Sequence, residues 1–154
     1  IEANSPGPVY ATLFIGVLDP ATRRLRYVNA GHNPQYVLRA QGGLERMHAT
    51  RLAVGLLAGR GYVERSIDLV QGDLLCFYTD GCVEVENERS EEFGVDRLEA
   101  LLLSSVESPD PLHQIETGIA TFRGRSEPLD DATLMTVKVG KGRGVPITGR
   151  ANAW

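Results

Sequence analysis

The sequence is short of cysteine, of basic charge and of long apolar runs, and each shortage excludes a class of protein. Two cysteines among 154 residues are too few for a disulfide scaffold. Sixteen basic against twenty acidic residues give a net charge of −4, which argues against a nucleic-acid partner. No apolar run approaches the ~18 residues of a membrane span, and no signal peptide opens the chain. We therefore expect a cytoplasmic chain without a membrane segment.

Several catalytic motifs are also missing. There is no G-x-x-x-x-G-K-[ST] phosphate loop, no G-x-S-x-G nucleophile elbow and no H-E-x-x-H zinc helix. Cys82 is followed by Glu84, Glu86 and Glu88, whose charges would raise the pKa of its thiol. A cysteine nucleophile is therefore not expected, and both cysteines are predicted to be small core residues.

The pattern of apolar residues predicts many short strands and then two helices. In the first half, apolar or alternating segments predict a β-meander with strands at Val9–Leu18, Leu25–Asn29, Gln35–Arg39, Leu44–Met47, Tyr62–Leu69 and Leu74–Tyr78. Helical spacing predicts helices over Val95–Ser105 and Pro111–Phe122, and Ala132–Val139 predicts a closing strand. This arrangement belongs to the α+β class. We expect one domain over residues 1–139 and a flexible tail over 140–154.

Three polar clusters lie next to these strands. They are Tyr78-Thr79-Asp80-Gly81 with Glu84, Leu129-Asp130-Asp131-Ala132-Thr133, and Ala30-Gly31-His32-Asn33-Pro34. Taken singly, each is explained as an ordinary turn. Taken together, Asp80 ends one apolar strand and Asp130 precedes another. If those strands are antiparallel neighbours, the two carboxylates meet at one sheet edge, where a cation would relieve their repulsion. Oxygen ligands suit Mg²⁺ or Mn²⁺.

The same clusters carry a family resemblance. The motifs AGHNP, GD-x-L-x-x-YTDG-x-x-E and DD-x-T occur in order between about Tyr10 and Val139. In this order they resemble the bacterial sporulation-stage-II-E branch of the metal-dependent protein phosphatases, the PPM or protein phosphatase 2C superfamily. The resemblance implies an antiparallel β-sandwich flanked by helices. It also implies a serine/threonine phosphoprotein phosphatase that uses two Mn²⁺ or Mg²⁺ ions and a metal-bound water.

The resemblance assigns roles to particular residues. Asp80 and Asp130 match the metal-ligand aspartates of the family, and Asp131 is expected to shape the turn beside them. Gly81 belongs to the YTDG motif, and Glu84 and His32 match positions near a weaker third metal site. Relatives dephosphorylate anti-sigma-factor antagonists, so the implied substrate is a phosphoserine or phosphothreonine in such a bacterial regulator.

The resemblance also leaves part of the family pattern unmatched. The chain begins at Ile1, and nothing in Ile1–Val9 resembles the first strands and helix of the family, which carry an aspartate that bridges both metals. We therefore expect a fragment or a truncated relative that binds metal weakly and has little activity alone. The alternative is a degenerate, non-catalytic module that binds a partner. Self-association through exposed sheet edges is also expected.

Overall fold

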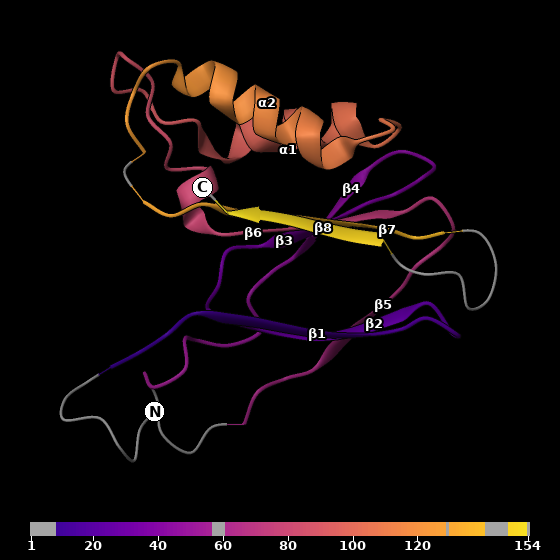
Figure 1. Cartoon of the computed structure of the whole chain (residues 1–154). Coiled ribbons are helices and arrows are strands. Elements are labelled where there is room, and N and C mark those ends of the chain that lie inside the picture. Colours follow the sequence, from indigo (N-terminus) through magenta and orange to yellow (C-terminus); the bar gives the residue numbers. More distant parts are fainter. Residues whose placement is uncertain (1–8, 57–60, 129, 141–147, 154) are drawn as a thin grey trace. The chain divides into compact units, whose positions relative to one another are not determined.

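The computed structural model describes residues 9–56, 61–128, 130–140 and 148–153 of the chain (Figure 1). The chain divides into two compact units, one comprising residues 1–34 and 46–69 and the other residues 35–45 and 70–154. The first unit holds a three-stranded antiparallel sheet of order β1-β2-β5, with β1 at Leu13–Asp19, β2 at Arg24–Ala30 and β5 at Arg65–Asp68.

Strand β1 is more exposed than its apolar sequence suggests. Leu13, Ile15 and Val17 alternate along one face of β1 and are 43%, 55% and 56% exposed. Strand β2 has a buried face instead, with Leu25, Tyr27 and Asn29 all below 8% exposure. Among the described residues, β1 is an edge strand that pairs within its sheet only with β2.

The second sheet has five strands in the order β4-β3-β6-β7-β8. Their bounds are β3 Gln35–Leu38, β4 Leu44–Met47, β6 Leu74–Tyr78, β7 Thr133–Lys138 and β8 Thr148–Ala153. Strand β6 pairs antiparallel with β3 on one side and with β7 on the other. A central strand must be apolar on both faces, which agrees with the unbroken run LLCFY in β6.

Two helices cover one face of this sheet, as Figure 1 shows. Helix α1 spans Gly94–Ser105 and buries Leu98 and Leu102, which are one turn apart. Helix α2 spans Pro111–Arg123. It begins with Pro111 and is capped by the Asp110 carboxylate, which accepts a hydrogen bond from the His113 N–H at 3.2 Å. Together with the sheet, the two helices enclose the main apolar core of the described residues.

The predicted α+β class is confirmed, with two antiparallel sheets and two helices. The predicted meander is wrong, because β3 and β4 join the second sheet while β5 pairs with β2. The expected flexible tail over residues 140–154 stays a prediction. Residues 148–153 form β8 on the outer side of β7, although the sequence there has no strand-like alternation. Backbone pairing with a formed edge strand needs no apolar side chains.

Candidate functional site

The ends of β6 and β7 bring the two predicted aspartates to one edge of the five-stranded sheet. Tyr78 pairs with Leu134 in the antiparallel register. One step further along, the Thr79 N–H donates to the Thr133 carbonyl at 3.0 Å. Asp80 therefore follows β6 at the edge where Asp130 precedes β7. The condition on which the sequence argument rested, antiparallel neighbours, is met.

Asp80 opens a short 3₁₀ turn. The turn, η1, spans Asp80–Cys82, and the Asp80 carbonyl accepts hydrogen bonds from the N–H groups of Val83 and Glu84 at 2.8 and 3.0 Å. Its own carboxylate accepts from the Gly81 N–H at 3.1 Å. The side chain is exposed, so its charge remains in contact with solvent. The tight turn holds the backbone of Asp80 at the sheet edge.

The turn before β7 has a similar local bond. The exposed Asp130 carboxylate accepts a hydrogen bond from the Asp131 N–H at 2.7 Å. Asp131 touches the opposite turn with its backbone, because a Cβ built on Gly81 would lie 2.5 Å from the Asp131 carbonyl oxygen. Only glycine leaves room for this approach of the two turns. Asp131 thus contacts the 3₁₀ turn through its main chain.

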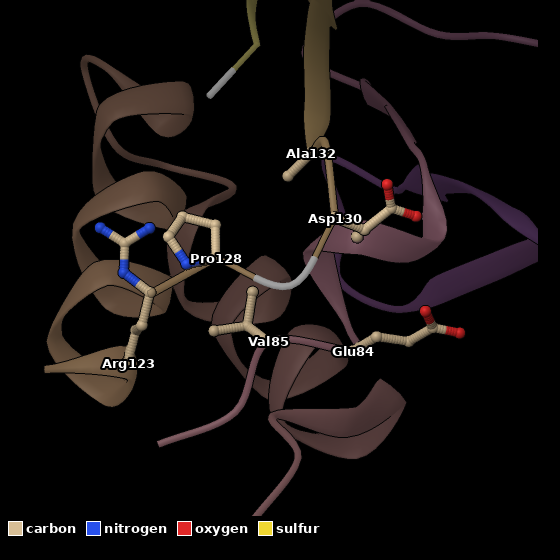
Figure 2. Close-up of a pocket in the computed structure, with 7 residues that line it drawn as sticks. Glu84, Val85, Arg123, Pro128, Asp130 and Ala132 are labelled. Carbon is tan, nitrogen blue, oxygen red and sulfur yellow. The ribbon is translucent and has the colours of Figure 1, made fainter. Parts of the chain in front are cut away.

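A small cavity lies beside the two turns. It measures about 10 Å³, room for roughly one water molecule, and is lined by Gly81, Glu84, Val85, Arg123, Pro128, Asp130 and Ala132. Figure 2 shows the carboxylates of Glu84 and Asp130 extending to the same side, whereas the Arg123 guanidinium points the opposite way beyond Pro128. The structure thus brings Glu84, Gly81 and Asp130 around one cavity, with Asp80 next in the chain to Gly81.

His32 belongs to the first unit, within the loop Ala30–Pro34. The buried Asn29 organises this loop: its side chain donates to the carbonyls of Asn33 and Met47 at 3.2 and 3.0 Å and accepts from the His32 N–H at 2.9 Å. The His32 Nδ1 lies 3.1 Å from the Thr12 hydroxyl. Within its own unit, the His32 ring therefore has a hydrogen-bonding partner.

The cysteines are core residues, as the sequence indicated. Cys76 and Cys82 are both fully buried and form no disulfide. Burial raises the pKa of the Cys82 thiol to about 12, and the nearby Asp80 charge adds to this effect. Burial raises the pKa of Cys76 as well. Both thiols stay protonated at neutral pH and are poor nucleophiles.

The donor atoms at this end of the sheet are of the type that a hard divalent cation prefers. Over the described ranges, too few of them lie close together. Asp80, Asp130 and Glu84 offer only carboxylate oxygens, the ligands that Mg²⁺ and Mn²⁺ prefer. Within the part of the chain that the structure describes, however, no group of three or more His, Cys, Asp or Glu side chains lies close enough to hold a metal ion. Among the described residues, the carboxylates at this end of the sheet thus do not form a metal site by themselves.

A larger cavity, of about 300 Å³, lies at the opposite ends of β6 and β7, where Leu74 and Lys138 pair. Three of its polar side chains make hydrogen bonds within the protein. The Lys138 ammonium donates to the Val106 carbonyl, the Asp110 carboxylate caps α2, and the Ser108 hydroxyl accepts from the Asp110 N–H at 3.3 Å. This cavity lies beside the loop that joins α1 to α2.

Two side chains that form hydrogen bonds at the site, those of Thr79 and Gln35, were not identified from the sequence. The Thr79 hydroxyl accepts a hydrogen bond from the Thr133 N–H at 2.9 Å and joins the two turns. The buried Gln35 side chain accepts from the Tyr78 N–H at 2.7 Å and donates to the Tyr78 carbonyl at 3.2 Å. No local spacing in the sequence pointed to Gln35, because its partner Tyr78 lies 43 positions further along the chain.

Comparison with known proteins places this geometry in a family. The family model described as Stage II sporulation protein E (SpoIIE) matches residues 1–140. Protein IcfG of Synechocystis sp. is 32% identical over 130 residues, which is 84% of this chain and 20% of that protein. The phosphoserine phosphatase RsbP of Bacillus subtilis is 31% identical over 75 residues, 49% of this chain and 19% of that protein.

A solved structure agrees in fold. The PP2C phosphatase domain of Bacillus subtilis SpoIIE, solved with a fragment of its regulatory domain, superposes with a TM-score of 0.71 at 18% identity. The match covers 91% of this chain and 41% of the solved chain. The chain spans about a fifth of the length of the two curated relatives. With its α+β fold, its strand-end aspartates and a family match over residues 1–140, the chain belongs to the SpoIIE family and forms part of a PP2C-type phosphatase domain.

Proposed function

We propose that this chain contributes two metal-ligand aspartates, Asp80 and Asp130, to a metal-dependent serine/threonine phosphoprotein phosphatase. The observation that carries the proposal is the pairing of β6 with β7, which puts both aspartates at one edge of the sheet. The name of the relative RsbP, a phosphoserine phosphatase, supports the reaction class. Mn²⁺ or Mg²⁺ is the proposed cofactor, with two ions in the complete domain and weak binding by this chain.

The carboxylates present can bind and orient a cation, but alone they are too few to complete its coordination shell. Asp80 and Asp130 offer carboxylate oxygens to a cation, and Glu84 places a third carboxylate beside their cavity. Asp131 and Gly81 hold the two turns against each other. A divalent ion bound by such groups supplies positive charge that neutralises phosphate oxygens and lowers the pKa of a bound water. His32, near Thr12 in the first unit, is proposed only as a near-site residue.

The substrate is proposed to be a phosphoserine or phosphothreonine in a bacterial regulator such as an anti-sigma-factor antagonist, and the location cytoplasmic. None of the helices in the described residues is long and apolar enough to cross a membrane.

The second candidate function is a non-catalytic module of the same fold that binds a partner. The shortage of metal-ligating groups among the described residues favours this alternative for the chain by itself.

Phosphate release tests the proposal in the full-length protein that contains this chain. We expect release from a phosphoserine regulator to require Mn²⁺ and to fall by about a hundredfold or more in Asp80→Asn and Asp130→Asn, because outer-shell changes alone cost 10–100-fold. The matched control is Asp68→Asn, which removes an exposed aspartate paired with Arg24 and should leave turnover unchanged. Wild-type turnover in both aspartate variants would overturn their role as metal ligands, and no Mn²⁺-dependent release from the wild-type protein would favour the binding module.

A further inference from the structure

Thr79 is the residue at which the β6–β7 ladder changes its bonding partners. In a regular antiparallel ladder, opposed residues of each hydrogen-bonded pair exchange two N–H···O=C bonds, and these pairs alternate with non-hydrogen-bonded ones. Thr79 and Thr133 exchange only one, from the Thr79 N–H to the Thr133 carbonyl. The Thr79 carbonyl accepts instead from the Cys82 N–H at 3.0 Å, a bond that starts the 3₁₀ turn of Asp80. The strand therefore ends at Thr79 so that the turn can begin.

The Thr79 side chain restores the bond that the backbone gave up. Its hydroxyl oxygen accepts from the Thr133 N–H at 2.9 Å, in place of the Thr79 carbonyl. As the N-cap residue of the turn, Thr79 would ordinarily direct its hydroxyl at the turn's own N–H groups, yet it makes no such bond. The hydroxyl is thus used across the strands, between the turn of Asp80 and the start of β7.

Two further contacts close the same junction. The Cys82 thiol donates to the Thr133 carbonyl with its Sγ 3.4 Å away, and Gly81 lies against the Asp131 carbonyl. Among these contacts, the hydroxyl bond is the one that a substitution can remove while the size and branching of the side chain are kept. We propose that Thr79 is a positioning residue, whose hydroxyl sets Asp80 relative to Asp130 for joint binding of a divalent cation.

This inference rests on the proposed function, and one experiment distinguishes the failure of each. MnCl₂ is titrated into the ¹⁵N-labelled chain, and paramagnetic broadening of the amide signals of residues 80–82 and 130–132 is followed, because it detects weak binding. In wild type and Thr79→Ser, which keeps the hydroxyl, both segments should broaden at the same Mn²⁺ concentration. In Thr79→Val, which keeps the shape, the concentration for half broadening should rise about tenfold.

The controls separate positioning from general stability. Thr121→Val removes a hydroxyl that bonds to the Thr117 carbonyl in α2, and it should leave the titration unchanged. Faster amide hydrogen exchange at Thr133 should accompany the Thr79→Val effect, and Thr79→Ala serves as the second variant if Thr79→Val does not fold. Equal titrations in wild type, Thr79→Ser and Thr79→Val would overturn the role of Thr79 alone. Absence of broadening at both segments in wild type would overturn the proposed aspartate pair as well.

Discussion

Gly81, in the first turn of the candidate site, is packed closely against the backbone of the second turn. A Cβ there would meet the Asp131 carbonyl oxygen at 2.5 Å, its carbon at 2.9 Å and the Ala132 Cα at 3.2 Å, all of them backbone atoms. Backbone cannot rotate away as a long side chain can, so an added methyl group must push the two turns apart. At this position the sequence motif is explained by sterics rather than by chemistry.

We expect Gly81→Ala to lower the free energy of unfolding by about 1–3 kcal/mol, the usual cost of overpacking. Urea denaturation of the 154-residue chain measures it. Gly61→Ala is the matched control, because a Cβ there meets nothing within 4 Å. It should be neutral or stabilising by up to about 1 kcal/mol. Equal stability of the two variants would show that the turns can separate freely.

At the scale of elements, the last residue of β6 is hydrogen-bonded to a side chain of β3, that of Gln35. The pairing of β3 with β6 ends at Tyr36 and Cys76, two residues before Tyr78. The buried Gln35 side-chain amide bonds to both backbone groups of Tyr78. One side chain thus completes the ladder directly before Thr79 and Asp80.

Replacing Gln35 by methionine should destabilise the chain by roughly 2–4 kcal/mol. The substitution keeps the length of the side chain but leaves the buried N–H and carbonyl of Tyr78 without this partner, at about 1–3 kcal/mol for each group. Urea denaturation again measures the change. The exposed Gln71→Met in the turn before β6 should stay within about 0.5 kcal/mol of wild type. A loss below 1 kcal/mol in Gln35→Met would mean that Tyr78 finds other partners.

Across the whole molecule, several buried groups in the second unit ionise only at alkaline pH. Burial raises the pKa of Cys82 to about 12 from an ordinary value of 9.0 and also raises that of Cys76. Burial likewise raises the pKa of Tyr36, and that of its stacked neighbour Tyr78. The unfolded chain therefore releases these protons at a lower pH than the folded chain does. Stability that is fully present below pH 9 is lost as the pH rises toward 12.

The expected result is a free energy of unfolding that falls above pH 9, by up to about 1.4 kcal/mol per pH unit for each thiol. Urea denaturation at pH 7.5, 9, 10 and 11 measures the slope. Cys76→Ala and Cys82→Ala should each reduce this slope, whatever their effect on stability at pH 7.5. A slope that both variants leave unchanged would assign the alkaline loss to other groups.

Local pattern in the sequence predicted most of the elements, with β8 as an exception. The run Leu74–Tyr78 predicted β6 with its exact bounds, and Leu44–Met47 predicted β4 equally well, because strand periodicity and turn residues act over a few neighbours. The choice of Asp80 and Asp130 came from their places at strand ends and, independently, from the family resemblance. That choice remains a prediction of function.

Only the tertiary structure decided which strands pair and what holds the turns. The exposed face of β1 reads in the sequence like a buried strand, and β8 has no pattern at all, because burial and edge pairing depend on distant residues. The hydrogen bonds of Thr79 to Thr133 and of Gln35 to Tyr78 span 54 and 43 positions of sequence. No local spacing encodes such contacts, since they exist only after β3, β6 and β7 have come together.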